Sequence, residues 1–387
     1  MANRIMLNQT SYHGAGAIAE IVNEAKAHDY KKAFVCSDPD LIKFQVSTKV
    51  TDLLDQAGLS YEIYSNIKAN PTIENVQTGV AAFKKSGADY IIAIGGGSSM
   101  DTAKAIGIII ANPEFEDVRS LEGVAPTRKP CVPIIAVPTT AGTAAEVTIN
   151  YVITDVERKR KFVCVDPHDM PIIAVVDPEM MSSMPKGLTA ATGMDALTHA
   201  VEGYIGGENT AQTKKDSVEA VQLIHKYLKE AYDHGDNLEA RNKMQYASFI
   251  AGRAFTRSYV GYVHAIAHTL GGHYGVPHGL ANAVILPYVL EAYGKSAHKK
   301  LARLADCIGI QGKDDAEKAN AFIQWIRDMN SSMNIPDKIR AKDGSQLIKE
   351  EDLADCITKA LHEANPLYPC PQIWDRKEVE AIFRKIM

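Results

Sequence analysis

The first half of the chain alternates short β-branched, apolar runs with longer segments whose apolar residues recur every three to four positions. Runs of the first kind have the length and composition of buried strands, and segments of the second kind have the period of amphipathic helices. This pattern predicts strands at 31–38, 61–64, 89–94, 132–137 and 172–177, and helices at 41–57 and 73–85. The alternation indicates a doubly wound, mostly parallel sheet.

After about residue 185 the strand pattern stops and only helical periods follow. Helices are expected at 188–204, 211–232, 237–254, 261–270, 278–293, 297–308, 315–329, 346–364 and 375–386. We therefore expect an α/β fold with an α/β domain over 1–185 and an all-α domain over 186–387.

Composition narrows the class of protein. The net charge is -5, and without a basic stripe to neutralise phosphates we expect no nucleic-acid partner. No apolar run approaches the ~20 residues of a membrane span, and the first residues do not resemble a signal peptide. The 6 cysteines are scattered without a C-x-x-C pair, so they are expected to be free thiols in a cytoplasmic protein.

Carboxylate and imidazole side chains recur at helical spacing in the second half of the chain. Asp195 precedes His199 by one turn, His264 precedes His268 by one turn, and His278 follows shortly after. Residues four apart share one helix face, so each pair can direct two ligands at one point. This spacing favours a divalent metal site, and buried histidines with ordinary hydrogen bonds are the alternative.

A glycine-rich segment follows the strand expected at 89–94. Gly96 and Gly97 precede Ser98 and Asp101, which have the spacing of a capping box at the start of a helix. Glycines and the free N–H groups of a helix N-terminus suit a phosphate. The segment matches neither common nucleotide motif, so a plain strand-to-helix turn is the alternative.

Two further features point to a dinucleotide. Thr139, Thr140 and Thr143 follow the strand expected at 132–137, and hydroxyls at the end of a parallel strand can hold a diphosphate or ribose. Asp38 ends the strand expected at 31–38. A carboxylate at this position can accept a hydrogen bond from the 2′-hydroxyl of the adenosine ribose and would repel a 2′-phosphate. This favours NAD over NADP, although Asp38 could equally cap the next helix.

These motifs together resemble the iron-dependent (group III) alcohol dehydrogenase family over essentially the whole chain. The resemblance is carried by Gly-Gly-Gly-Ser-x-x-Asp-x-x-Lys at 95–104, Pro-Thr-Thr-x-Gly-Thr-x-x-Glu at 138–146, Asp-x-x-x-His-x-x-x-Glu at 195–202, His-x-x-x-His at 264–268 and Pro-His-Gly at 277–279. Residues 1–205 look most like the bacterial members that act on lactaldehyde and propanediol. The resemblance implies an NAD-dependent dehydrogenase that acts on small alcohols or aldehydes, with an NAD-binding first domain and a metal-binding, catalytic second domain.

The resemblance also implies roles for single residues. Asp195, His199, His264 and His278 match the family's metal ligands, with Fe(II) as the first choice of ion and Zn(II) as the second. His268 matches a histidine beside the metal that can transfer protons, and Glu202 could orient a ligand imidazole or be a surface carboxylate. The remaining matches are cofactor contacts at Asn70, Val152 and Lys161 and substrate-pocket walls at Asn150 and Phe255.

The resemblance further implies a homodimer, for which an N-terminal strand at 4–8 offers an edge. We expect the two half-sites to meet in a cleft between the domains. Three alternatives stay open: a dehydroquinate-synthase-like lyase using NAD and a metal, a metal-dependent hydrolase, and a non-catalytic binder. The apolar residues around the histidines favour a small neutral alcohol over a phosphorylated sugar.

Overall fold

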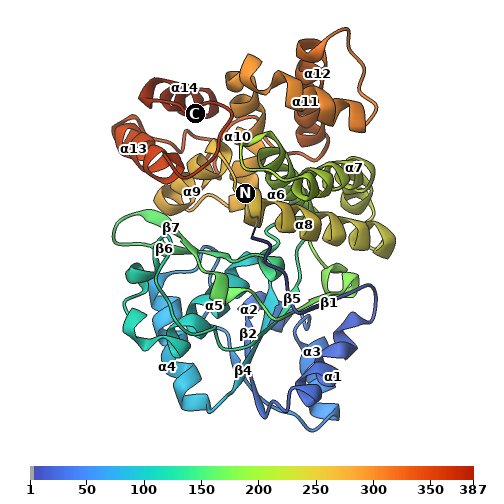
Figure 1. Cartoon of the computed structure of the whole chain (residues 1–387), viewed down its shortest axis with the longest axis vertical. Helices are drawn as coiled ribbons and strands as arrows, with labels where there is room; N and C mark the ends of the chain where they lie inside the picture. Colours follow the sequence, from blue (N-terminus) through green and yellow to red (C-terminus); the bar gives the residue numbers. More distant parts are fainter. Residues whose placement is uncertain (1–3) are drawn as a thin grey trace. The chain divides into compact units, whose positions relative to one another are not determined.

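The structure, a computed structural model, describes residues 4–387. The chain forms two compact units, Met1–Met184 and Pro185–Met387. The first unit contains all the sheet strands and the second is helical (Figure 1). Within the described residues no helix is long and apolar enough to cross a membrane.

A parallel sheet of six strands forms the centre of the first unit, in the order β1-β8-β5-β4-β2-β3. Its strands are β1 (Thr10–His13), β2 (Lys32–Ser37), β3 (Ser60–Tyr64), β4 (Tyr90–Gly95), β5 (Ile134–Pro138) and β8 (Ile173–Val176). All of their pairings are parallel. A separate antiparallel hairpin is formed by β6 (Asn150–Asp155) and β7 (Arg160–Val165).

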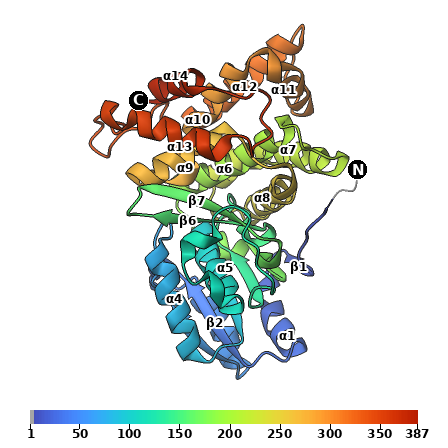
Figure 2. The same cartoon turned by 60° about the vertical axis from the view of Figure 1, so that its left-hand side comes forward.

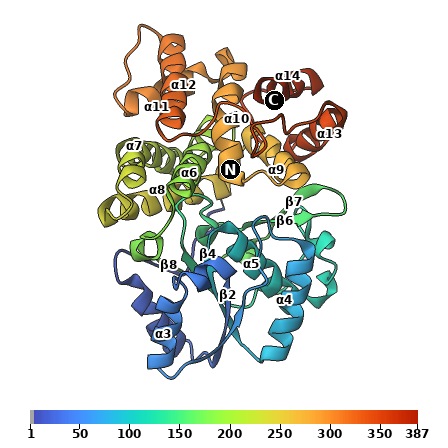
Figure 3. The ribbon, with the colours of Figure 1, turned by 180° about the vertical axis from the view of Figure 1, so that it is seen from behind.

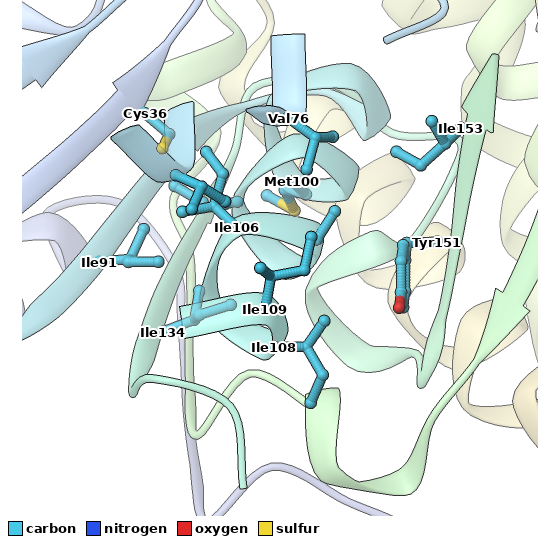
Figure 4. Packing of buried hydrophobic residues seen from close by; sticks show 14 of the residues in the cluster. Cys36, Val76, Ile91, Met100, Ile106, Ile108, Ile109, Ile134, Tyr151 and Ile153 are labelled. Atoms are coloured by element: carbon cyan, nitrogen blue, oxygen red, sulfur yellow. The ribbon is translucent and has the colours of Figure 1, made fainter. Parts of the chain in front are cut away.

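Apolar side chains on both faces of this sheet build two cores. Along β4, Ile91 and Ala93 belong to one cluster, whereas Ile92 and Ile94 belong to the other, as the alternation of a strand requires. Helices α4 (Ile73–Ser86) and α5 (Gly97–Ala111) cover the first face, where Ile106 and other residues of α5 pack on the strands (Figure 4). Helices α1 (Glu20–Ala27) and α3 (Thr48–Gln56) cover the second face (Figure 1), and Figure 2 shows α1 and α4 on opposite sides of the sheet. The predicted doubly wound α/β fold is therefore confirmed.

Several elements of the first unit differ from the sequence prediction. The single helix expected at 41–57 is two helices, α2 (Pro39–Lys43) and α3, because Gln45 between them adopts a left-handed φ of 58°. The strand expected at 4–8 does not form; the N-terminal strand is β1, which begins at Thr10 and pairs with β8. Neither α1 nor the β6–β7 hairpin was predicted.

The second unit is a set of helices arranged around α6 (Figure 3). Helix α6 is buried over most of its length because it packs against α7, α8 and α10, while α9 packs against α10 and α13. The helices are α6 (Lys186–Ile205), α7 (Ala211–Asp233), α8 (Leu238–Ser258), α9 (Tyr262–Tyr274), α10 (His278–Tyr293), α11 (Lys295–Cys307), α12 (Asp315–Ser332), α13 (Leu353–Ala364) and α14 (Arg376–Ile386). The helix expected from 346 begins later, since a short 3-10 turn (Glu350–Asp352) precedes α13.

Candidate functional site

The four predicted metal ligands come together in the second unit. Asp195 and His199 lie one turn apart on α6, His264 lies on α9, and His278 is the first residue of α10. One donor atom from each lies within 4.8 Å of the donor atoms of the others. Asp195, His199 and His264 are at most 4% exposed, so the carboxylate and the imidazoles converge in a buried place.

A close approach of two helices brings His278 to this cluster. Helix α9 ends at Tyr274, the next residue Gly275 has a φ of 70°, and α10 begins directly after Pro277. At Gly279 a Cβ atom would lie 2.5 Å from the carbonyl oxygen of Ala191 on α6. Because glycine has no Cβ, α10 can approach α6 until His278 Nε2 lies 3.4 Å from Asp195 Oδ1.

The buried carboxylate of Glu202 fixes His264. One turn beyond His199 on α6, Glu202 accepts hydrogen bonds from His264 Nδ1 at 2.6 Å and from the N–H groups of Gly261 and Val263 at 2.9 Å. Burial alone would lower the pKa of His264, but its bond to Glu202 and the charge of that residue outweigh burial and raise the pKa. Since the Nδ1 proton faces Glu202, the Nε2 lone pair of His264 is left for the cluster. The hypothesis that Glu202 is a surface carboxylate is therefore wrong.

His268 lies beside the four donor atoms and is held by a carboxylate of its own. Its ring stacks on that of His278 with a centroid distance of 5.0 Å. Its Nδ1 lies 2.7 Å from Oε1 of Glu363, which also accepts the hydroxyl of Tyr368 at 2.8 Å. The bond to Glu363 fixes the ring orientation of His268.

The two predicted substrate-pocket residues lie in different units of the chain. Phe255 on α8 stacks on the ring of His199 at a centroid distance of 4.1 Å, which places it directly beside the cluster. Asn150 is the first residue of β6, and its backbone carbonyl oxygen accepts a hydrogen bond from Lys104 Nζ at 2.9 Å.

The two predicted nucleotide loops touch each other at the carboxyl ends of β4 and β5. A Cβ on Gly96 would lie 3.1 Å from Thr140 Cγ2, and a Cβ on Gly97 would lie 2.9 Å from Thr143 Cγ2. The backbone N–H of Thr139 donates to the Gly95 carbonyl at 3.0 Å. Helix α5 begins at Gly97 without a side-chain cap, so the loops meet at a helix N-terminus suited to an anion.

The predicted capping box at this helix is wrong. Ser98 already lies inside α5, and Asp101 accepts the backbone N–H of Val152 on β6 at 3.1 Å. Burial raises the pKa of Asp101 to about 6, although Lys104, the Val152 amide and Lys161 act in the opposite direction. Asp101, Val152 and Lys161 thus gather where α5 meets the hairpin.

Asp38 and Asn70 have local structural roles. The Oδ1 atom of Asp38 accepts the N–H groups of Asp40 and Leu41 at 3.0 Å and so caps α2, as the alternative hypothesis predicted. Asn70 has a left-handed φ of 59° before Pro71, as is typical of a turn residue.

Two residues of the helical site were missed. Asn282 lies one turn beyond His278 on the same face of α10, a spacing that could have revealed it. Glu363 is 95 residues away from His268 in sequence, and no local pattern connects the two.

Comparison with known proteins identifies the family. Residues 8–178 match the model of iron-containing alcohol dehydrogenases, and residues 189–387 match the C-terminal model of the Fe-containing alcohol dehydrogenase family. The lactaldehyde reductase of Escherichia coli (strain K12) is 46% identical over 365 residues, which are 94% of this chain and 94% of that protein.

Solved structures agree with these matches. A 1,3-propanediol oxidoreductase has a TM-score of 0.93 and 36% identity, with 100% of both chains covered. Sulfoacetaldehyde reductase from Bifidobacterium kashiwanohense, solved in complex with NAD+, has a TM-score of 0.84 and 28% identity over 100% of this chain and 99% of its own. Both halves of the sequence match one family, and the chain therefore belongs to the iron-containing alcohol dehydrogenases.

Proposed function

We propose that this oxidoreductase uses NAD(H) and one Fe(II) ion to interconvert small aldehydes and alcohols, with lactaldehyde and 1,2-propanediol as its first substrates. The observation that carries the proposal is the buried convergence of Asp195, His199, His264 and His278 in a member of this family. In this proposal residues 1–185 bind NAD, and residues 186–387 hold the metal and the reacting groups.

The donor set fits the proposed ion. One carboxylate and three imidazoles suit Fe(II), with Zn(II) as the second choice, and no cysteine is among the clustered donors. When bound, such an ion acts as a Lewis acid that polarises the oxygen of the substrate. Glu202 would hold the imidazole of His264 in the tautomer that presents Nε2.

We assign the transfer of the hydroxyl proton to His268. Its Nδ1 is engaged by Glu363, so Nε2 is the atom that exchanges the proton. Glu363 keeps the ring in place and balances the positive charge that His268 acquires when it takes the proton.

For the cofactor, we propose that the N-terminus of α5 and the threonines at 139, 140 and 143 bind the NAD diphosphate. When held there, NAD(H) would supply the hydride acceptor or donor for the substrate carbon. Both capping bonds of Asp38 use Oδ1, so its carboxylate can cap α2 and also accept the ribose 2′-hydroxyl through Oδ2. Val152, Lys161 and Asn70 are further proposed contacts. The NAD+ complex of the sulfoacetaldehyde reductase supports this choice of cofactor.

The substrate proposal is supported by the name of the 46% identical relative and by the apolar ring of Phe255 beside His199. We propose Phe255 and Asn150 as contacts for the short carbon chain. We also propose a cytoplasmic homodimer, because the 6 cysteines are free thiols and the family resemblance implies a dimer. Light scattering of the purified protein tests the dimer.

An anaerobic preparation tests the proposed function. Metal analysis should find about one iron per chain, and NADH oxidation should proceed with lactaldehyde, glycolaldehyde, propanal or butanal. The His264→Ala variant should lose iron and turnover, whereas His234→Ala, an exposed histidine outside the cluster, should keep both. Turnover by His264→Ala at the parental rate would refute the metal assignment.

A further inference from the structure

The side-chain amide of Asn282 lies against three of the four converging donor atoms. Its Nδ2 is 2.6 Å from Asp195 Oδ1, 3.1 Å from His264 Nε2 and 3.2 Å from His278 Nε2. Asn282 is 0% exposed and shares a face of α10 with His278, because the two residues are four positions apart.

The chemistry of the neighbours fixes which end of the amide faces them. A carboxylate oxygen only accepts hydrogen bonds, and the terminal amide atom of Asn282 lies 2.6 Å from Asp195 Oδ1. The N–H₂ group must therefore point at the donor atoms, since a rotated amide would place Oδ1 against the Asp195 carboxylate. The Oδ1 atom consequently points away, where it is buried without a hydrogen-bond partner in the described structure. An unsatisfied buried acceptor is unfavourable, which indicates that the bond from Nδ2 to Asp195 determines this orientation.

We propose that Asn282 is a positioning residue of the metal centre, which holds the Asp195 carboxylate in place through its amide; this inference rests on the proposed function. The Asp195 Oδ1 atom lies 3.4 Å from His278 Nε2 and 3.9 Å from His264 Nε2, so the three donor atoms are near enough to one another to share one ion. Each imidazole Nε2 has a single lone pair, which a bound ion would take, so the bond that Asn282 can keep in the loaded protein is the one to the carboxylate oxygen of Asp195.

The test is a Co(II) titration of chelator-treated protein, read from the visible d–d bands and from competition with a chelator. Asn282→Leu removes the donor at similar volume. The control is Asn330→Leu on α12, because Asn330 is also a buried asparagine but donates to the Ala283 carbonyl, a backbone group. We expect Asn282→Leu to bind Co(II) about 10- to 100-fold more weakly, with altered bands, and Asn330→Leu to keep the parental affinity and bands.

The shorter Asn282→Ser variant is included in case Asn282→Leu does not fold, and it should show the same loss because its side chain is too short to keep the bond to Asp195 Oδ1. Circular dichroism selects the variants that fold. Parental Co(II) affinity and bands in a folded Asn282 variant would overturn this inference and leave the proposed function intact. Failure of the parent protein to bind Co(II) at all would instead refute the proposed metal site.

Discussion

At the scale of single residues, carboxylates outside the donor set hold the imidazoles. Glu202 accepts two backbone N–H groups at the start of α9 as well as the Nδ1 proton of His264. The same carboxylate therefore stabilises the helix N-terminus and orients His264, one of the proposed metal ligands. Glu363 has the corresponding role toward His268.

We predict that Glu202→Gln weakens metal binding about 10- to 100-fold, because the neutral amide no longer stabilises the Nδ1 proton of His264. The measurement is a chelator competition on the anaerobic protein. Glu208→Gln is the control, since Glu208 is an exposed neighbour paired with Arg257. Equal metal affinities in the two variants would contradict the role of Glu202.

We predict that Glu363→Gln lowers kcat by about tenfold or more while the metal content stays at the parental level, because His268 loses the charge that supports its protonated form. Tyr368→Phe removes only the hydroxyl bond to Glu363 and should have a smaller effect. Steady-state kinetics with metal analysis of each preparation provides the measurement. An unchanged kcat in Glu363→Gln would exclude the assigned proton route.

The residues that the sequence revealed are those related by local spacing. Asp195 with His199 and His264 with His268 follow the period of a helix, so their convergence on one face was predictable. Glu363 was not predictable, because it reaches His268 only through the packing of α13 on α9. The ribose contact at Asp38 stays a prediction, and the structure adds its capping bonds.

At the scale of elements, the contact between the glycine turn and the threonine loop shapes the proposed diphosphate site. Gly97 leaves room for the side chain of Thr143, and Gly96 leaves room for Thr140. The turn was predictable from the run of glycines after an apolar strand. The start of α5 was not predictable. Gly96 occupies the N-cap position, and Asp101 accepts a hydrogen bond from Val152 in a hairpin that the sequence pattern did not reveal.

We predict that Gly97→Ala weakens NADH binding by about tenfold, because the added methyl group would lie 2.9 Å from Thr143 Cγ2 and displace the loop. Fluorescence titration with NADH gives the dissociation constant. The double variant Gly97→Ala with Thr143→Ser removes the clashing methyl and should recover most of the affinity. A double variant no better than Gly97→Ala would show that the clash is not the cause.

An ion pair between Arg119 and Asp155 anchors the hairpin that carries Val152 and Lys161. Arg119 donates to Asp155 at 2.7 Å and holds the pKa of that carboxyl, which is 1% exposed, below its ordinary value. A lowered pKa means that the pair stabilises the fold above the ordinary pKa of aspartate and that this contribution is lost as pH falls through the lowered value.

We therefore predict that Arg119→Met lowers the free energy of unfolding by about 1–3 kcal/mol at pH 7, with a smaller difference at pH 3. Urea unfolding at both pH values measures the effect. Arg158→Met is the matched control and should have less effect, because Arg158 is 3.7 Å from Asp155 and more exposed. An effect independent of pH would contradict the role of the Asp155 charge.

At the scale of the whole molecule, the change from alternating strands and helices to helices alone predicted the fold class, which the family and the structure confirm. Strand order was not predictable, since β1 joins the sheet beside β8 through a pairing of residues more than 160 positions apart. Family membership also decides among the alternatives, because it favours a dehydrogenase over a lyase, a hydrolase or a non-catalytic binder.

Anomalous diffraction at the iron edge, from crystals of the anaerobically prepared enzyme, tests the central claim most directly. We predict one strong peak about 2.0–2.2 Å from donor atoms of Asp195, His199, His264 and His278. The absence of a peak at these four side chains in a preparation that contains iron, or its presence elsewhere in the molecule, would contradict the claim.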